Sequence, residues 1–306
     1  MQYCTLGEKQ ASRIVMGCMR IADKSVQQVE EVIVEALQTG VNTFDHADIY
    51  GGGDSERIFG VAIRDLKIPR KQYVLQTKCG IRRLERGSYY DFSKEHIISS
   101  VEGSLKRLNT EYIDVLLLHR PDTLMEAEEV AEAFATLRAD GKVLAFGVSN
   151  ASASQMQLLE EAGIEIVANQ IQFSLGHTAP IDAGFNVNMY NDAGVARAGD
   201  ALEYARRRKI ALQAWSPLQY GKIAGTFLDN ERYPALNGEL YRLAEMYNCS
   251  PSAVALAWVL RHPAFAQVIT GTTSPEHMKQ LCKATEITLS REEWYTLYLS
   301  AGKKLP

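Results

Sequence analysis

Four side chains capable of acid–base chemistry follow successive apolar stretches of this sequence: Asp45, Tyr50, Lys78 and His119. Asp45 and Tyr50 lie in the segment from Asn42 to Gly51, where a short apolar strand is expected to run into a loop. Each of the four has a plain structural interpretation by itself: a helix cap, a packed phenol, a surface lysine and a loop histidine. Their occurrence after successive apolar stretches favours a shared site instead.

Together these groups suit the reduction of a carbonyl. Tyrosine, with a reference pKa of about 10, is a weak acid, but a nearby lysine cation stabilises the phenolate and makes proton donation easier. We expect Asp45 to keep Lys78 charged and oriented, because an unpaired buried lysine is costly. His119 could then hydrogen-bond the substrate carbonyl. These residues offer neither a strong nucleophile nor a metal cage, so a cofactor would have to supply the hydride.

The elements that position these residues are apolar strands alternating with amphipathic helices. Gly40 is expected to end the first helix, and Asp54 is expected to cap the second. Strands are expected at 13–17, at the start of 42–51, and at 73–77, 113–118, 144–148, 166–169, 210–214 and 267–269. Helices are expected at 26–40, 54–63, 94–108, 127–139, 153–161 and 198–208, with a helical pair around 240–261.

Several of these strands are near-continuous apolar runs, such as Asp114–Leu118, which is typical of parallel strands covered on both faces. Eight such strands separated by helices predict an α/β fold of the (β/α)8 TIM-barrel type. A doubly wound sheet is the competing architecture, but no G-x-G-x-x-G turn follows an early strand. Gly51–Gly53 lacks the spacing of a phosphate-binding loop, and we interpret it as a flexible loop beside Tyr50.

Two segments lie outside the alternation. Residues 174–197 are rich in Gly, Asn, Asp and Ala without clear periodicity, and we expect either a lid over the barrel mouth or a mobile surface excursion. Residues 290–299 are expected to form a C-terminal helix with Trp294, Leu297 and Tyr298 on one face. No low-complexity run or Pro-rich linker divides the chain, so residues 1–306 are predicted to form a single domain.

The composition indicates an ordinary water-soluble protein. Of the 306 residues 46% are hydrophobic and 23% charged, and the formal net charge is -4 at pH 7, which does not suggest a nucleic-acid-binding protein. The N-terminus does not resemble a secretory signal, and no apolar stretch is long enough to span a bilayer. The five scattered cysteines form no C-x-x-C pair, which favours reduced thiols and a cytoplasmic location.

The carboxyl ends of barrel strands normally carry the functional side chains. Ser149, Asn150 and Gln170 offer hydroxyl and amide groups that can bind a carboxamide, and Trp215 offers a flat face on which a nicotinamide ring could stack. Two loops, 216–222 and 271–273, offer backbone N–H groups, hydroxyls and one cation for phosphates.

The sequence resembles the aldo-keto reductase superfamily, in its bacterial type, along nearly its whole length. The resemblance implies a (β/α)8 barrel with NADPH extended across its mouth, and a catalytic tetrad of Asp45, Tyr50, Lys78 and His119. The motifs that carry it are Gly40–Asp45 with Tyr50–Gly51, Ser104–Leu108, Tyr112–Asp114, Leu118–Asp122, Gly147–Asn150, Asn169–Gln170, Ala214–Leu218 and Gly271–Thr273. The cofactor contacts expected with it are Gly17, Met19, Asp45, Ser149, Asn150, Gln170, Trp215, Ser216, Pro217, Leu218, Gly221, Lys222, Gly271, Thr272, Thr273, His277 and Gln280.

One departure from the family pattern concerns the cofactor. Many relatives hold the 2'-phosphate with a Lys in the loop after strand eight and an Arg in the following helix. This chain has Gly271 and His277 there, and Lys222 or Lys279 could compensate. We therefore expect NADP(H) first, with NAD(H) as the alternative.

Three functions fit the sequence to different degrees. The first is an NAD(P)H-dependent oxidoreductase that reduces a small aldehyde or ketone, with no nucleic-acid or membrane partner and an open oligomeric state. The second is a cofactor-sensing regulatory barrel, because the superfamily includes barrels that accompany membrane channels. The chain begins almost at the barrel, which favours the enzyme. The third, a metal-dependent hydrolase using Asp45, His46 and Asp48, lacks a convincing ligand set, so no metal is expected.

Overall fold

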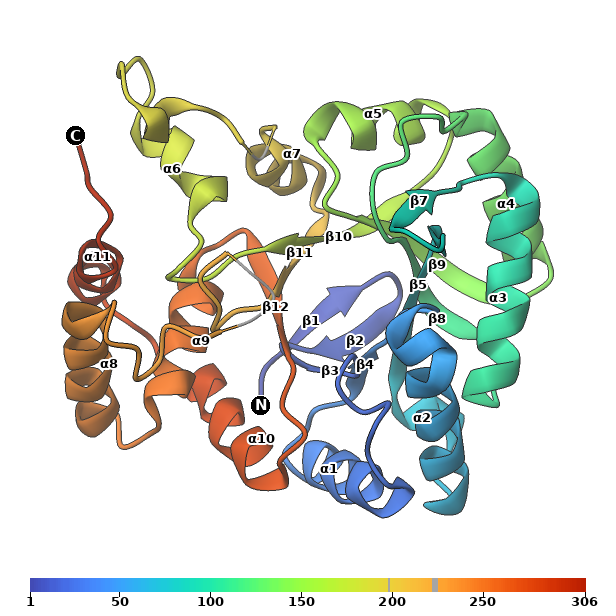
Figure 1. Ribbon diagram of the computed structural model, residues 1–306, viewed down its shortest axis with the longest axis horizontal. Coiled ribbons are helices and arrows are strands. Elements are labelled where there is room, and N and C mark those ends of the chain that lie inside the picture. The colour runs from blue at the N-terminus through green and yellow to red at the C-terminus, as the bar shows by residue number, and fades with distance from the viewer. Residues whose placement is uncertain (198, 222–224) are drawn as a thin grey trace.

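A computed structural model describes residues 1–197, 199–221 and 225–306. Parallel strands form a closed barrel in the order β10-β11-β12-β3-β4-β5-β8-β9, with helices around it (Figure 1). The predicted (β/α)8 barrel is therefore confirmed. Its strands are β3 (Ile14–Gly17), β4 (Thr43–Asp45), β5 (Val74–Cys79), β8 (Ile113–Leu118), β9 (Val143–Ser149), β10 (Ile166–Gln172), β11 (Ala211–Trp215) and β12 (Phe265–Thr270).

The helices follow the strands as the apolar periodicity predicts. They are α1 (Val26–Gln38), α2 (Asp54–Asp65), α3 (Lys94–Leu108), α4 (Ala127–Ala139), α5 (Ala153–Glu161), α6 (Ala179–Phe185), α7 (Ala201–Arg208), α8 (Pro234–Met246), α9 (Pro251–Arg261), α10 (Pro275–Cys282) and α11 (Arg291–Ser300). Short 3-10 helices lie at η1 (Tyr50–Gly53), η2 (Arg70–Gln72), η3 (Asp192–Gly194) and η4 (Lys283–Glu286). None of the helices in the described ranges is long and apolar enough to cross a membrane.

The ends of two helices show why the sequence folds locally as it does. Gly40 follows the C-cap of α1 with φ 86°, a left-handed conformation that glycine adopts readily, as expected for a residue that ends a helix. The predicted cap of α2 is wrong. Gly53 occupies the N-cap position, and Asp54 is the first helical residue, where its carboxylate accepts a hydrogen bond from Arg57 at 2.9 Å.

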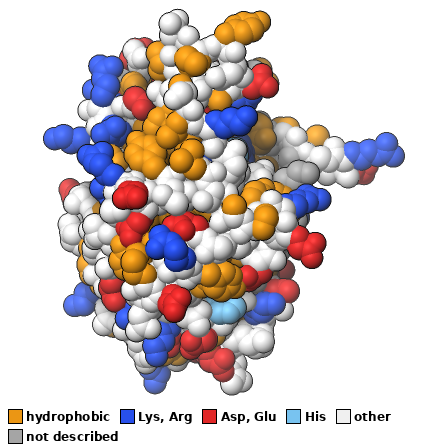
Figure 2. Space-filling model, turned by 90° about the vertical axis from the view of Figure 1, so that its left-hand side faces the viewer, with side chains coloured by type: hydrophobic (Ala, Val, Ile, Leu, Met, Phe, Trp, Pro, Cys, Tyr) orange, Lys and Arg blue, Asp and Glu red, His pale blue; other side chains and the backbone are white. Residues whose placement is uncertain are grey.

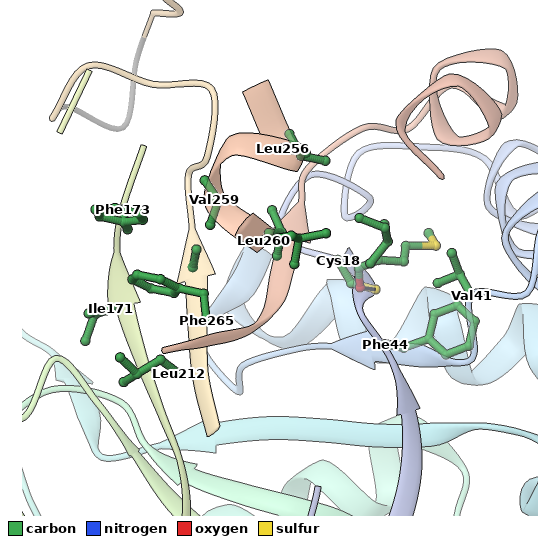
Figure 3. Close-up of a cluster of buried hydrophobic side chains, with 14 of the residues drawn as sticks. Cys18, Val41, Phe44, Ile171, Phe173, Leu212, Leu256, Val259, Leu260 and Phe265 are labelled. Carbon is green, nitrogen blue, oxygen red and sulfur yellow. Dashed lines mark hydrogen bonds between the residues drawn. The ribbon is translucent and has the colours of Figure 1, made fainter. Parts of the chain in front are cut away.

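The main apolar core lies between the barrel and its helices. Figure 3 shows side chains of α9 meeting those of β10, β11 and β12 in this layer. The Phe173 and Phe265 rings stack there with centroids 4.3 Å apart. Farther out, Trp258 of α9 and Trp294 of α11 stack at 4.8 Å, and each indole N–H donates to the other's backbone carbonyl at 3.0 Å. These paired bonds fix the predicted C-terminal helix against α9.

A hairpin that the apolar pattern does not predict closes one end of the barrel. Strands β1 (Tyr3–Leu6) and β2 (Lys9–Ser12) pair antiparallel across this end (Figure 1). Leu6 and Ala11 are buried there in a separate small core, against Val74, Val115, Leu117, Ala145 and Ala168 of the barrel strands. The barrel interior is therefore apolar and filled at this end.

Two other excursions flank the opposite end. The hairpin of β6 (Ile81–Arg83) and β7 (Ser88–Tyr90) follows β5, and Arg83 donates to the carbonyl oxygen of Ile49 at 2.9 Å. Residues 174–197 contain α6 and η3. Tyr298 of α11 donates to Asp182 at 2.9 Å, and the Phe185 ring lies 5.3 Å from that of Tyr298. This segment is therefore attached to the outer helices.

The surface carries mixed charge, in keeping with the net charge of -4. On the face shown in Figure 2, basic and acidic side chains are interspersed with scattered hydrophobic ones.

Candidate active site

Lys78, Asp45 and Tyr50 meet at the mouth of the barrel. Asp45 ends β4. Lys78 lies within β5, because this strand continues to Cys79 and not only to the expected end at residue 77. The Lys78 ammonium donates to Asp45 Oδ2 at 2.7 Å, to the backbone oxygen of His46 at 2.7 Å and to the Tyr50 hydroxyl at 3.0 Å. All three of its N–H groups are thus used, and Asp45 acts as counter-ion rather than as a helix cap.

Lys78 is fully buried yet charged. Burial alone lowers the pKa of a lysine, but the charges of Asp45 and Tyr50 and their hydrogen bonds outweigh it and raise the pKa of Lys78 above its usual value. Since breaking a buried pair leaves an uncompensated charge, Asp45 and Lys78 depend on each other.

Tyr50 is turned toward Lys78 by a tight loop. Gly51, Gly52 and Gly53 all have positive φ, at 58°, 69° and 97°. At Gly51 a side-chain carbon would lie only 2.4 Å from that of Ala22, so this position requires glycine. The pKa of Tyr50 is raised because its burial outweighs the lowering effect of Lys78. The phenol is therefore protonated at neutral pH, as an acid must be before it reacts.

His119 follows β8 and lies beside Tyr50. Its ring meets the Tyr50 ring edge-on, with centroids 5.9 Å apart. Burial, together with the positive charges of Lys78 and Arg120, lowers the pKa of His119 well below its usual value, so the imidazole is neutral. Its Nδ1 is buried and has no hydrogen-bond partner among the described residues. A neutral imidazole of this kind can donate a hydrogen bond to a carbonyl oxygen.

The residues expected to bind a carboxamide lie together on β9, β10 and β11. Asn150 donates to Ser149 Oγ at 2.7 Å, and Ser149 Oγ donates to the backbone oxygen of Gln170 at 3.1 Å. The Trp215 indole donates to Asn150 Oδ1 at 3.1 Å, which fixes the ring expected to stack on a nicotinamide. Gln172, the register partner of Trp215, has a buried Nε2 without a partner in the described part of the chain.

The other residues expected to contact the cofactor lie at the end of β3, in the loops after β3, β11 and β12, and in α10. Gly17 ends β3, where a side-chain carbon would lie 2.8 Å from the Thr270 oxygen, and Met19 after it is exposed. His277 is exposed in α10, where Gln280 bonds Glu276 at 3.0 Å. The remaining expected contacts lie in the loops themselves: Ser216, Pro217, Leu218 and Gly221 after β11, and Gly271, Thr272 and Thr273 after β12. Lys222 lies outside the described residues.

Two arginines at this end are not predicted from the sequence as parts of the site. The Arg120 guanidinium lies 5.5 Å from the centre of the Trp215 ring. Arg20, after β3, lies beside the loop after β12: a side-chain carbon at Gly271 would be 3.9 Å from Cζ, Nε and Nη1 of Arg20. Arg20 makes no hydrogen bond or ion pair with the described residues. Both contacts arise between loops far apart in the sequence, so only the closed barrel reveals them.

Asp45, His46 and Asp48, considered together as metal ligands, have separate surroundings. The buried His46 ring packs edge-on against Phe59 with centroids 4.5 Å apart, and burial lowers the pKa of His46 to about 3. Burial, together with the charge of Glu56, raises the pKa of Asp48 to about 7. Within the described ranges, no cluster of three or more His, Cys, Asp or Glu side chains is placed to hold a metal ion.

Comparison with known proteins adds independent findings. A family model described as "Aldo/keto reductase family" matches residues 13–298. The chain is 36% identical to a 6-dehydroglucose reductase of Agrobacterium fabrum, with all of both chains covered. It is 34% identical to the oxidoreductase YdhF of Escherichia coli, over 95% of this chain and 93% of the relative. The crystal structure of a thermostable aldo-keto reductase, Tm1743, with the inhibitor epalrestat superposes with a TM-score of 0.77 at 25% identity, covering 98% of this chain and 100% of that one.

Proposed function

The chain belongs to the aldo/keto reductase family and is an oxidoreductase, and from that premise we propose that it reduces an aldehyde or ketone to an alcohol with NADP(H). The observation that carries this proposal is the hydrogen bond from the buried Lys78 ammonium to the Tyr50 hydroxyl, backed by Asp45. It joins a proton donor to the cation that stabilises the donor's conjugate base. We further propose that residues 1–306 work as a single domain.

Tyr50 acts as the general acid. Its O–H donates a proton to the carbonyl oxygen, and the phenolate left behind is stabilised by Lys78 at 3.0 Å. Lys78 stays charged because Asp45 Oδ2 lies 2.7 Å from its ammonium. The neutral His119 imidazole donates a hydrogen bond to the same carbonyl oxygen and so orients the substrate.

A nicotinamide, when bound, would supply the hydride. The residues present suit such a group, because Gln172 has a buried amide nitrogen without a partner in the described chain, next to Trp215. Ser149, Asn150 and Gln170 would hold the carboxamide, and Trp215 would cover one ring face. Loop residues 216–221 and 271–273 would bind the phosphates.

The preference for NADP(H) is supported by Arg20. Where many relatives have a lysine, Gly271 leaves room for a guanidinium that arrives from the neighbouring loop. An arginine without an ionic partner among the described residues can bind a phosphate through two parallel N–H groups.

The test is consumption of NADPH, followed by its absorbance, with a panel of small aldehydes, ketones and oxidised sugars. The sugars are included because one relative is named a 6-dehydroglucose reductase. We expect turnover by the wild-type protein, and a loss of roughly 10²–10⁴-fold in kcat for Tyr50→Phe with cofactor binding retained. Tyr241→Phe, which removes a remote exposed hydroxyl bonded to Asp229, is the control. Full activity of Tyr50→Phe would refute the assigned acid.

A further inference from the structure

The barrel interior contains a layer of glutamine side chains at the level of Asp45. Gln76, Gln170, Gln213 and Gln267 lie on β5, β10, β11 and β12, and each is 3% exposed or less. Gln213 is the register partner of both Gln170 and Gln267, and Asp45 is the register partner of Gln76. Four amides and one carboxylate therefore share the cross-section of the barrel.

These amides form a connected chain of hydrogen bonds. Gln76 and Gln213 pair reciprocally, with N–O distances of 3.0 and 2.9 Å. Gln213 also donates to Gln267 at 2.8 Å, and Gln267 donates to the backbone oxygen of Ser12 at 2.8 Å. The chain thus runs from the β2 end of the barrel to Gln76, with each amide held by the next.

The chain ends on Asp45. Gln76 donates to Asp45 Oδ1 at 2.6 Å, and Gln170 donates to the same oxygen at 3.0 Å. The other oxygen, Oδ2, accepts from Lys78. Both oxygens of the carboxylate are therefore held by donors, which fixes its rotation.

We propose that Gln76, held by Gln213, is a positioning residue that keeps the Asp45 carboxylate turned toward Lys78. Its effect on catalysis rests on the proposed function, because it acts through Asp45 and Lys78 on Tyr50. A purely structural role would affect the fold alone, and it would be shared by Gln267, which is equally buried but does not contact Asp45.

Gln76→Glu separates these two roles, because a protonated carboxyl nearly reproduces the shape of the amide and can still donate to Asp45. Once ionised, it faces Asp45 with a like charge. The other titratable groups around Asp45 are Lys78, Tyr50 and Cys18, and His46, Asp48 and His119 lie near Lys78. The variant leaves all of them in place. Gln267→Glu introduces the same carboxyl at the far end of the chain.

We expect the ratio of kcat/KM in Gln76→Glu to that of the wild type to fall by about tenfold or more between roughly pH 6 and pH 9. The ratio for Gln267→Glu should stay constant over this range. Gln76→Leu should lower kcat/KM by about tenfold at every pH, because it removes one hydrogen bond to a charged group. If the kcat/KM ratios of the two Glu variants changed with pH in the same way, the proposal would be overturned.

A double-mutant cycle in unfolding experiments tests the same contact without turnover. Gln76→Leu and Asp45→Asn should be coupled, whereas Gln267→Leu and Asp45→Asn should be close to additive. Equal coupling in both cycles would refute the assignment. Absence of wild-type turnover would refute the proposed function, and this cycle would still decide the role of Gln76.

Discussion

At the scale of single residues, the position of Arg20 bears on the choice between NADP(H) and NAD(H). Where many relatives have a lysine and an arginine, this chain has Gly271 and His277. This difference by itself argues against NADP(H). The Arg20 guanidinium lies over Gly271, where its Cζ, Nε and Nη1 are equally distant from the position of a missing side chain. Under the proposed function, a cation from the loop after β3 would take the place of one from the loop after β12.

We predict that Arg20→Ala raises the KM for NADPH by about tenfold, because a charge-assisted hydrogen bond to phosphate is lost. An unchanged KM for NADH would assign Arg20 to the 2'-phosphate, and a parallel rise would assign it to the diphosphate. Lys279→Ala, which removes an exposed cation from α10, is the matched control. If only Lys279→Ala raised the KM for NADPH, the role assigned to Arg20 would be wrong.

The sequence predicted which residues meet at the mouth because each follows an apolar strand. It could not predict contacts made by closure of the barrel. Arg20 and Gly271 are far apart in the chain and meet because β3 pairs with β12. Gln76, Gln213 and Gln267 did leave a signal: each is a polar residue inside an otherwise apolar strand.

At the scale of elements, two helical glycines differ sharply in their surroundings. Gly60 of α2 lies against the end of α3, where a side-chain carbon would be 2.5 Å from the Arg107 backbone oxygen. Gly238 of α8 has nothing within 4 Å of that position. The α2–α3 packing therefore depends on a glycine, whereas α8 does not.

We predict that Gly60→Ala lowers the free energy of unfolding by about 1–3 kcal/mol, because the helices must move apart. Gly238→Ala should raise it by roughly 0.5–1 kcal/mol, because alanine favours a helix interior. Urea denaturation followed by circular dichroism measures both. A stabilised Gly60→Ala variant would show that α2 has more freedom to shift than its contacts indicate.

The strand and helix pattern of the barrel was predictable because long apolar periods dominate it. The apolar pattern predicts neither hairpin, since their strands are only three or four residues long and mix polar with apolar side chains. Residue type alone predicts a capping role for Asp54, whereas the left-handed Gly53 determines where α2 begins. Residues 174–197 show little apolar periodicity, because α6 is short and contacts the outer helices through only a few aromatic side chains.

At the scale of the whole molecule, the buried His46 and the partly buried His262 couple stability to pH. Burial lowers the pKa of His46 to about 3 and that of His262 to about 4. Below about pH 6.5 the unfolded chain binds protons that the folded chain does not, so these residues reduce stability as the pH falls. Asp48, whose pKa is raised to about 7, acts in the opposite direction between its unfolded value and pH 7.

We predict that His262→Phe flattens the pH dependence of unfolding between about pH 6.5 and pH 4. The slope should decrease by up to about 1.4 kcal/mol per pH unit, the maximum for one titrating group. Phenylalanine keeps the ring that packs edge-on against Phe265. His277→Phe, at an exposed position, controls for removal of a histidine as such. Equal slopes in wild type and His262→Phe, measured by urea denaturation, would contradict this account.

The hairpin of β1 and β2 closes one end of the barrel. Leu6 and Ala11 fill the closed end of the barrel, and the layer of glutamine side chains above them carries no proton that titrates near neutral pH. Under the proposed function, the proton given up by Tyr50 would therefore return from solvent at the open end of the barrel. The hydride donor and the carbonyl compound would enter at the same end as this proton. The order in which cofactor and carbonyl compound bind and leave would therefore be linked to the chemical step.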